Sequence, residues 1–237
     1  MKIILLFVFS VLSFTSNAQK DAKKDFTPPM FMRTIGVSFQ KFDGLNSLLA
    51  NRPEYKQLRD YAGTLGMGWL TVNKRFVQVM DLTLGSSMSG DREKKSSTIR
   101  YAGAGLDFGY DLIKKDKIML YPMIGIGAQG YQARFYKDNS AVLFGDVLTS
   151  PTVQNSIRPV AFTNFFVTYR LGVGFAVKSA KHPDCSMGIK LGYAGSFKDK
   201  AWKSSDNQTL AGAPTDGLSQ FSASLVLTSI PHFMRKK

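Results

Sequence analysis

The chain is poor in the residues that most often build metal and redox centres. Its 237 residues include one cysteine, Cys185, and two histidines, His182 and His232. A single cysteine cannot form a disulfide within the chain, and it excludes a site built from several thiolates. After the first 18 residues no run of eighteen or more apolar residues occurs, so the sequence predicts no transmembrane helix in the remainder. A disulfide scaffold, a thiolate metal centre and a transmembrane helix after residue 18 are therefore excluded as interpretations, whereas an N-terminal membrane anchor stays as the weaker alternative to an export signal.

Acidic residues are also scarce, with 17 Asp and Glu against 31 Lys and Arg, which gives a formal charge of +14. Such an excess is typical of proteins that bind nucleic acid. However, the first residues have the features of an export signal, namely Lys2, an apolar stretch over 3–14 and small residues up to Ala18. We expect residues 1–18 to be a signal peptide cleaved near Ala18, and residues 19–30 to form a periplasmic segment. Because an exported chain rarely meets nucleic acid, nucleic acid is not expected as a partner.

Apolar residues alternate with polar or small residues in many segments after residue 30. In YAGAGLDFGYDLI, which begins at Tyr101, one row holds Ala102, Ala104, Leu106 and Phe108, and the other holds glycines and Asp107. This period of two predicts a β-strand, because successive side chains of a strand point to opposite faces. The pattern predicts eight strands, at 31–40, 63–72, 76–88, 97–113, 118–135, 164–178, 186–197 and 218–230.

The connections between these strands alternate between short and long. Short turns at one end and long loops at the other are typical of bacterial outer-membrane barrels. The alternation alone also fits a soluble sandwich, whose apolar row would point inward. The export signal, the loop lengths and the glycine-rich polar row favour the barrel, since glycine weakens a strand but suits a narrow lumen. We therefore predict an all-β, antiparallel up-and-down transmembrane β-barrel of eight strands over 31–233, with a basic tail at 234–237. A ten-stranded barrel that uses 136–163 is the alternative.

Aromatic residues stand near both ends of the apolar rows, as in the girdles of membrane barrels. The expected girdle residues are Phe39, Trp69, Tyr110, Phe165, Phe175, Tyr193 and Phe221. With these features the chain resembles the small outer-membrane barrels of the OmpA/OmpX type over nearly all of its mature length. The resemblance implies an outer-membrane location and assembly by the outer-membrane insertion machinery, which recognises a final strand that ends in an aromatic residue. Phe233 lies on the row of Phe221, but Pro231 interrupts the alternation, which departs from that signal.

Charged residues are expected in two places on the barrel. A periplasmic basic rim is expected from Lys74, Arg75, Lys114, Lys115, Lys117 and Lys181. Each cation near an anionic membrane surface contributes about 1 kcal/mol of attraction, so we expect this rim to contact lipid head groups; lysines that only keep the turns soluble are the alternative. A lumen polar network is expected among Asp81, Asp107, Asp111, Arg170 and Lys190, because isolated buried charges are costly. This network is expected to fill the middle of the barrel.

Two long loops carry apolar residues. Residues 41–60 have a helical pattern on both sides of Pro53, which we interpret as a solvated excursion, with a lid or a partner-docking element as the alternative. Residues 136–163 include apolar stretches at 141–144 and 147–148, which are expected to pack on the barrel mouth, add strands or contact another protein.

The remaining motifs do not favour enzymatic chemistry. Residues 125–130, GIGAQG, match a dinucleotide-binding fingerprint, but a strand pattern follows where a helix is required, so no cofactor is expected. Barrel enzymes of this type mostly need a histidine near the outer rim, and both histidines fall on the expected periplasmic side. We expect a non-enzymatic outer-membrane protein with an envelope-structural or interaction role through its extracellular loops. Its expected partners are outer-membrane lipid, lipopolysaccharide and an extracellular or envelope protein. A narrow porin-like channel for ions or small solutes is the alternative.

Overall fold

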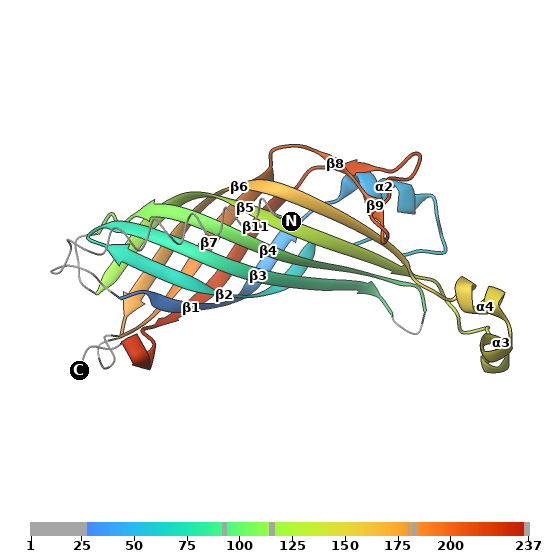
Figure 1. Ribbon diagram of the computed structural model, residues 1–237, viewed down its shortest axis with the longest axis horizontal. Coiled ribbons are helices and arrows are strands. Elements are labelled where there is room, and N and C mark those ends of the chain that lie inside the picture. Colours follow the sequence, from blue (N-terminus) through green and yellow to red (C-terminus); the bar gives the residue numbers. More distant parts are fainter. Residues whose placement is uncertain (1–27, 92–93, 114–116, 180, 182–183, 235–237) are drawn as a thin grey trace.

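Eight long antiparallel strands form a closed barrel in the computed structural model of the protein, which describes residues 28–91, 94–113, 117–179, 181 and 184–234 (Figure 1). The strand order is β5-β4-β3-β2-β1-β11-β7-β6, and pairing between β5 and β6 closes the circle. The long strands are β1 (Met30–Gln40), β2 (Tyr61–Asn73), β3 (Phe76–Gly90), β4 (Ser96–Tyr110), β5 (Ile118–Tyr136), β6 (Val160–Lys178), β7 (Cys185–Ser196) and β11 (Ser219–Ser229). All eight predicted strands are present, so the predicted fold class is confirmed.

Short helices and strands lie in the loops and after the last barrel strand. They are α2 (Asp43–Ala50), α3 (Phe144–Thr149), α4 (Pro151–Ser156), β8 (Lys200–Ala201), β9 (Lys203–Ser204), β10 (Thr215–Asp216) and the 3-10 helix η1 (His232–Met234). No helix in the described part of the chain combines the length and apolarity needed to cross a bilayer. The ten-stranded alternative is wrong, because residues 144–149 and 151–156 form α3 and α4 where two further strands would be required.

Neighbouring strands are staggered, so the strands tilt. The stagger can be followed from residue to paired residue around the barrel in the two directions, starting at Gly63 of β2. In one direction, across β3 and β4, the path reaches Gln132 of β5. In the other direction, across β1, β11, β7 and β6, it reaches Pro122 of the same strand. For eight strands, this ten-residue stagger between Pro122 and Gln132 corresponds to a tilt of roughly 40°. A lateral row of paired residues therefore climbs by about 3 Å per strand.

The outer wall of the barrel is apolar. Leu65 and Ile124 are 61% and 64% exposed, and the other exposed wall residues include Ile35, Leu84, Leu171, Leu191 and Leu225. Phe39, Tyr110, Phe165, Phe175 and Phe221 are exposed on this wall, as expected for girdles. Trp69 and Tyr193 are half-buried, with ring contacts to Phe31 at 5.3 Å and to Phe221 at 4.8 Å. The apolar rows thus point away from the barrel axis.

The inward rows are polar only along the middle of the barrel. Two apolar clusters fill the lumen on either side of that middle. The outer cluster consists of Phe42, Leu45, Leu49, Leu58, Ala62, Ile99, Tyr101, Tyr131, Ala133, Phe135, Phe166, Trp202 and Leu218. The inner cluster consists of Met30, Met32, Leu70, Val77, Val79, Met119, Tyr121, Met123, Ala176 and Val226. The glycine-rich polar rows identified in the sequence therefore describe only the middle of the lumen, and large apolar side chains fill the narrow interior at both ends.

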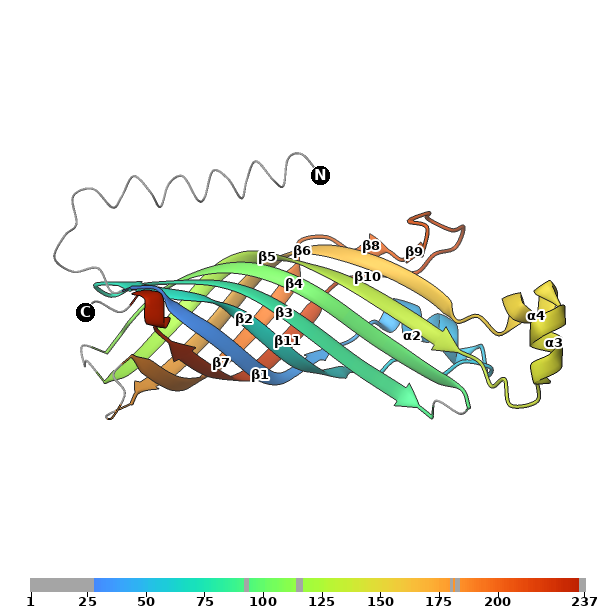
Figure 2. The same ribbon diagram turned by 60° about the horizontal axis from the view of Figure 1, so that its bottom comes forward.

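The long loops gather at one end of the barrel and the short turns at the other, as Figures 1 and 2 show. The helices α3 and α4 project beyond the barrel at the long-loop end, and Leu143, Phe144 and Leu148 are exposed there. The apolar residues of this loop therefore do not pack on the barrel mouth. The expected signal peptide, most of the expected segment 19–30 and residues 235–237 lie outside the described residues.

Candidate functional site

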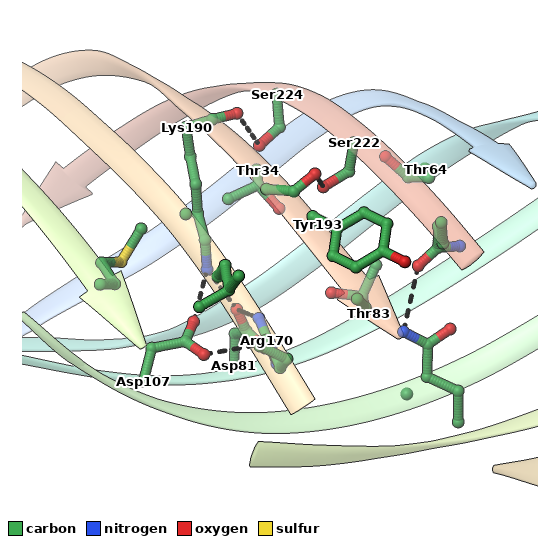
Figure 3. Close-up of a pocket in the computed structure, with 18 of the residues that line it drawn as sticks. Thr34, Thr64, Asp81, Thr83, Asp107, Arg170, Lys190, Tyr193, Ser222 and Ser224 are labelled. Carbon is green, nitrogen blue, oxygen red and sulfur yellow. Dashed lines mark hydrogen bonds and ion pairs between the residues drawn. The ribbon is translucent and has the colours of Figure 1, made fainter. Parts of the chain in front are cut away.

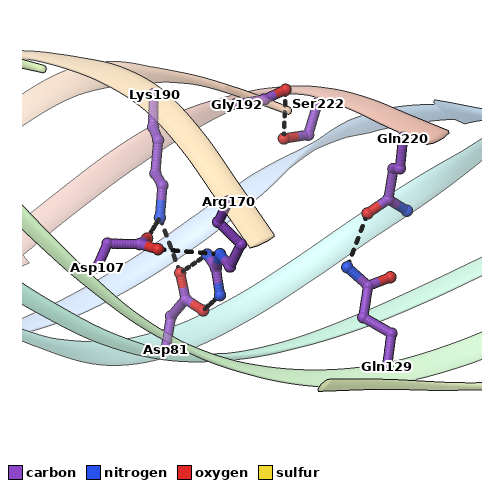
Figure 4. Close-up of polar contacts among 8 residues, drawn as sticks. All are labelled: Asp81, Asp107, Gln129, Arg170, Lys190, Gly192, Gln220 and Ser222. Carbon is purple, nitrogen blue, oxygen red and sulfur yellow. Dashed lines mark hydrogen bonds and ion pairs between the residues drawn. The ribbon is translucent and has the colours of Figure 1, made fainter. Parts of the chain in front are cut away.

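Four charged side chains meet inside the barrel from four different strands (Figure 4). Arg170 of β6 donates two hydrogen bonds to Asp81 of β3, from Nη1 to Oδ1 and from Nη2 to Oδ2, both at 2.8 Å. Lys190 Nζ of β7 donates to Asp81 Oδ2 at 2.8 Å and to Asp107 Oδ2 of β4 at 3.0 Å. Arg170 Nε lies 3.0 Å from Asp107 Oδ1. The two cations and two carboxylates form a ring in which charges alternate, and the ring carries no net charge.

The strand register explains why these side chains can meet. Asp107 is paired with Gly125, and Gly125 is paired with Arg170, so both charged residues face a strand position without a side chain. The Arg170 guanidinium occupies the space above Gly105, where a methyl group would overlap it. Glycine at these positions weakens the strands but allows close approach inside a narrow lumen. The glycines of the inward rows therefore make room for the charged side chains.

The ring is shielded from bulk water. Asp81 and Asp107 are 7% and 3% exposed. Buried charges of this kind are stable only when they are paired, since an unpaired ion loses its hydration without compensation. Asp107 Oδ1 has the ion-pair contact with Arg170 Nε but no aligned hydrogen bond within the described residues. The ring thus fixes the relative positions of β3, β4, β6 and β7 through charge pairing.

Asp111 does not belong to this network, which corrects the expectation from sequence. Its Oδ1 atom accepts hydrogen bonds from the backbone N–H groups of Ile113 and Leu120, both at 3.1 Å. β4 ends at Tyr110, so the alternation does not continue to Asp111. The residue instead stabilises the connection between β4 and β5 at the short-turn end.

A second polar layer lies between the charged ring and the outer apolar cluster. Gln129 Nε2 donates to Gln220 Oε1 at 3.0 Å, and Tyr131 Oη donates to Gln129 Oε1 at 2.7 Å. Gln220 Nε2 lies 3.1 Å from Tyr131 Oη and 3.4 Å from Gln40 Oε1. Sequence reasoning missed this layer because its members are uncharged. Gln40 and Gln220 are paired across β1 and β11, a register that only the closed barrel shows.

A cavity of about 80 Å³ separates the two polar layers (Figure 3). Hydroxyl groups line its wall together with the charged ring and the two glutamines Gln129 and Gln220. These hydroxyl residues are Thr34, Thr64, Thr83, Tyr101, Ser222 and Ser224. A polar cavity of this size holds a few water molecules. Tyr101 of the outer apolar cluster and Met123 of the inner one border it at its two ends.

The helix α2 closes the outer mouth of the barrel. Leu45 and Leu49 of α2 are buried in the outer apolar cluster together with Phe42, whose ring packs 5.4 Å from the ring of Trp202. The segment 41–60 is therefore a lid, and the favoured interpretation of a solvated excursion is wrong. Its apolar residues at 42, 45 and 49 have helical spacing, which places them on one face.

Asp216 holds the lid in place. Its carboxylate accepts hydrogen bonds from Gly44 N at 2.7 Å, from Leu45 N at 3.1 Å and from Trp202 Nε1 at 2.7 Å. These bonds satisfy two free N–H groups in the first turn of α2, where the helix dipole also favours an anion. Burial raises the pKa of the Asp216 carboxyl, and the three N–H donors only partly oppose this shift.

The expected basic rim lies at the short-turn end. Lys74 and Arg75 form the connection between β2 and β3, whereas Lys117 and Lys181 are exposed beside β5 and β7. Arg75 Nε donates to Asp111 O at 2.9 Å, and its guanidinium lies 4.6 Å from the Tyr110 ring, so this residue also stabilises the end of β4. Lys114 and Lys115 lie outside the described residues.

The described residues contain no group of three or more His, Cys, Asp or Glu side chains that could hold a metal ion. The sequence GIGAQG lies within β5, and the strand continues beyond it to Tyr136. The motif is therefore followed directly by neither a phosphate-binding turn nor a helix. Gly125 and Gly127 face the lumen in this strand and lie beside the charged ring. Their role here is to leave space for Asp107 and Arg170.

No protein-family model matches the sequence, and no curated protein matches it. Among solved structures, the chain is similar to Ail, the attachment invasion locus protein of Yersinia pestis, in complex with the heparin analogue sucrose octasulfate. The TM-score is 0.50 and the identity 11%, over 87% of this chain and 99% of Ail. The chain has the fold of the small eight-stranded outer-membrane barrels of the OmpA/OmpX type.

Two further solved structures also match over most of their length. OprG from Pseudomonas aeruginosa has a TM-score of 0.46 and 9% identity, over 88% of this chain and 98% of OprG. Neisserial surface protein A (NspA) has a TM-score of 0.43 and 11% identity, over 87% of this chain and 99% of NspA. At such identities a likeness concerns the fold alone.

Proposed function

We propose that the protein is an integral outer-membrane barrel without catalytic activity, closed to solutes, which acts in envelope integrity or protein interaction through its outer loops. The observation that carries this proposal is the filled lumen inside an apolar outer wall. Two apolar clusters enclose the polar layers, and α2 covers the outer mouth. An apolar wall of this kind is stable only in contact with hydrocarbon, because soluble proteins rarely expose large apolar surfaces.

The channel alternative has less support. A diffusion path would have to pass the inner cluster, the charged ring and the outer cluster in turn, and the interior of an eight-stranded barrel is just wide enough for side chains to fill. Conduction would require all three layers to open together. The structure therefore favours an anchor over a pore.

The loop that carries α3 and α4 is the best-placed element for an interaction role. It extends beyond the barrel at the long-loop end, and Leu143, Phe144 and Leu148 are 69%, 77% and 67% exposed. Large apolar side chains on a projecting loop are typical of protein-interaction sites. We expect a partner protein to bind this loop and cover its exposed apolar side chains.

Liposome swelling and planar-bilayer recording of the reconstituted mature chain test the closed barrel. We expect no swelling in small sugars and no stable open channels, beside a known porin as the positive control. Large and lasting conductance steps would refute the closed barrel and favour the channel.

Genetic complementation tests the loop. Cells that lack the protein should become sensitive to detergent or lose an adhesion phenotype, and the wild-type chain should restore it. A variant with Leu143, Phe144 and Leu148 replaced by serine should insert into the membrane but fail to restore the phenotype. Full complementation by this variant would refute the role of the loop.

A further inference from the structure

β4 and β5 extend toward the long-loop end of the barrel (Figure 2). The outward rows of the two strands change character at the same level. Ala102 and Gly130 form the last small or apolar pair on the outward face, and Arg100 and Gln132 form the next pair above them. On the neighbouring strands Leu84 is followed two positions on by Ser86, and Phe165 is preceded two positions back by Thr163. This change marks the level at which the wall leaves hydrocarbon and enters the head-group layer.

Polar side chains form a continuous row at this level. Ser86 is paired with Arg100, Arg100 with Gln132, and Gln132 with Thr163. Arg134 stands one outward position above Gln132 on β5. The row crosses four strands and presents two hydroxyl groups, an amide and two guanidinium groups on the outward face. The Thr163 hydroxyl donates to Ser204 O at 3.4 Å, so it is available to a ligand only as an acceptor. We call these residues the outer polar row.

The two arginines of the row have no side-chain partner among the described residues. Neither Arg100 nor Arg134 makes a side-chain hydrogen bond or an ion pair with another residue of the described chain. The outer polar row also contains no Asp or Glu. Arg100 and Arg134 are diagonal neighbours on paired strands, which places their Cβ atoms roughly 7 to 8 Å apart. Two long guanidinium side chains at this separation can reach one anion from two sides.

We propose that Arg100 and Arg134 bind a phosphate group of a phosphorylated glycolipid in the outer leaflet, with Gln132 and Thr163 hydrogen-bonded to its sugar. The guanidinium fork matches phosphate oxygens, and amide and hydroxyl side chains suit sugar hydroxyl groups. The exposed Phe165 lies below the row, where it contacts the upper part of an acyl chain. In such a lipid the phosphate is attached to a sugar, and the acyl chains extend from the sugar into the membrane. This order matches the order of the guanidinium, amide and aromatic groups on the barrel wall.

The site rests on the proposed outer-membrane placement, so the experiment measures insertion and lipid binding separately. Folded, detergent-solubilised barrel is titrated with diphosphoryl lipid A, with phosphatidylglycerol and with inorganic phosphate. The variants are Arg100→Gln/Arg134→Gln and, as a matched control, Arg52→Gln/Arg158→Gln, which removes two exposed loop arginines and the same charge. Heat-modifiable migration on gels and insertion into vesicles are measured for each variant.

We expect the wild type and the control variant to bind lipid A with the same affinity. The double variant Arg100→Gln/Arg134→Gln should bind it about 30-fold more weakly, and each single variant about 5-fold more weakly. Phosphatidylglycerol and inorganic phosphate should bind weakly and equally to all variants. Equal affinity of the double variant and the wild type for lipid A would overturn the proposed site. Binding of phosphatidylglycerol or free phosphate as tight as that of lipid A would refute a phosphorylated glycolipid as the specific ligand. Failure of the wild type to insert into vesicles would instead refute the outer-membrane placement.

Discussion

Removal of Lys190 should destabilise the barrel far more than its single charge suggests. Lys190 Nζ contacts Asp81 at 2.8 Å and Asp107 at 3.0 Å, and each contact corresponds to about 6 kcal/mol of attraction at an effective dielectric of 20, before desolvation is subtracted. In the variant Lys190→Met, two buried carboxylates share Arg170 alone. Breaking a buried ion pair by removing one partner typically costs about 3 to 5 kcal/mol. We therefore expect the free energy of unfolding to fall by about that amount.

Removing one charge of each sign should restore most of this loss. The double variant Lys190→Met/Asp107→Asn keeps the two hydrogen bonds between Arg170 and Asp81, so the remaining charges stay balanced. Replacing a whole buried pair is often close to neutral. We expect the double variant to lie within about 1 kcal/mol of the wild type, which gives a coupling energy of at least about 2 kcal/mol between the two positions.

Urea titration of the barrel in lipid vesicles measures these differences. The folded fraction is followed by heat-modifiable migration and by the fluorescence of Trp69 on the outer wall, and free energies follow from linear extrapolation. Lys198→Met, which removes an exposed loop lysine, is the control and should stay within about 0.5 kcal/mol of the wild type. A cost below about 1 kcal/mol for Lys190→Met, or strictly additive single variants, would refute the charge ring as a structural element.

Two further predictions concern the lumen and the lid. Gly105→Ala should displace the guanidinium of Arg170 and lower the urea midpoint, whereas Gly145→Ala, in open space on the outer loop, should leave it unchanged; equal midpoints would contradict the packing over Gly105. Burial raises the pKa of the Asp216 carboxyl in the closed lid above its value in an open, solvated lid. Closing of the lid is therefore coupled to proton uptake. The lid should consequently close more tightly as pH falls from 7 toward 4. Acrylamide quenching of Trp202, in a variant whose other tryptophan is phenylalanine, should therefore stay constant or decrease on acidification, and increased quenching would show the opposite sign.

The sequence predicts the barrel wall well because strand parity is a strict geometric rule. Period two gives each residue a face, so Asp81, Asp107, Arg170 and Lys190 are placed inside together once the strands are known. The same rule fails for Asp111, since the alternation in the letters continues past Tyr110 while the strand ends there. A strand boundary depends on where backbone pairing stops, and side-chain alternation alone does not encode it.

The lid and the glutamine layer could not be predicted from the sequence, for a different reason. Phe42, Leu45 and Leu49 have helical spacing, but their burial depends on Asp216 and Trp202, which lie more than 150 residues away in the chain. Similarly, Gln129 meets Gln220 only after the barrel closes. Contacts between distant loops follow from the three-dimensional arrangement, so local patterns indicate only which residues are available for them.

The polarity of the two faces reverses along single strands, which is the change expected where a barrel wall leaves the membrane. In β4, Gly103, Gly105 and Asp107 face the lumen, whereas further out Ile99 and Tyr101 are buried on the same inward row. The outward row changes in the opposite sense, from Phe108 and Ala104 to Arg100. Within the bilayer the apolar face meets lipid, and beyond it the same strand behaves as part of a soluble sheet with an apolar core under α2. The same alternation of side chains therefore suits both lipid and water. Near residue 102 the inward row becomes apolar, and this apolar surface is what the lid helix α2 packs on.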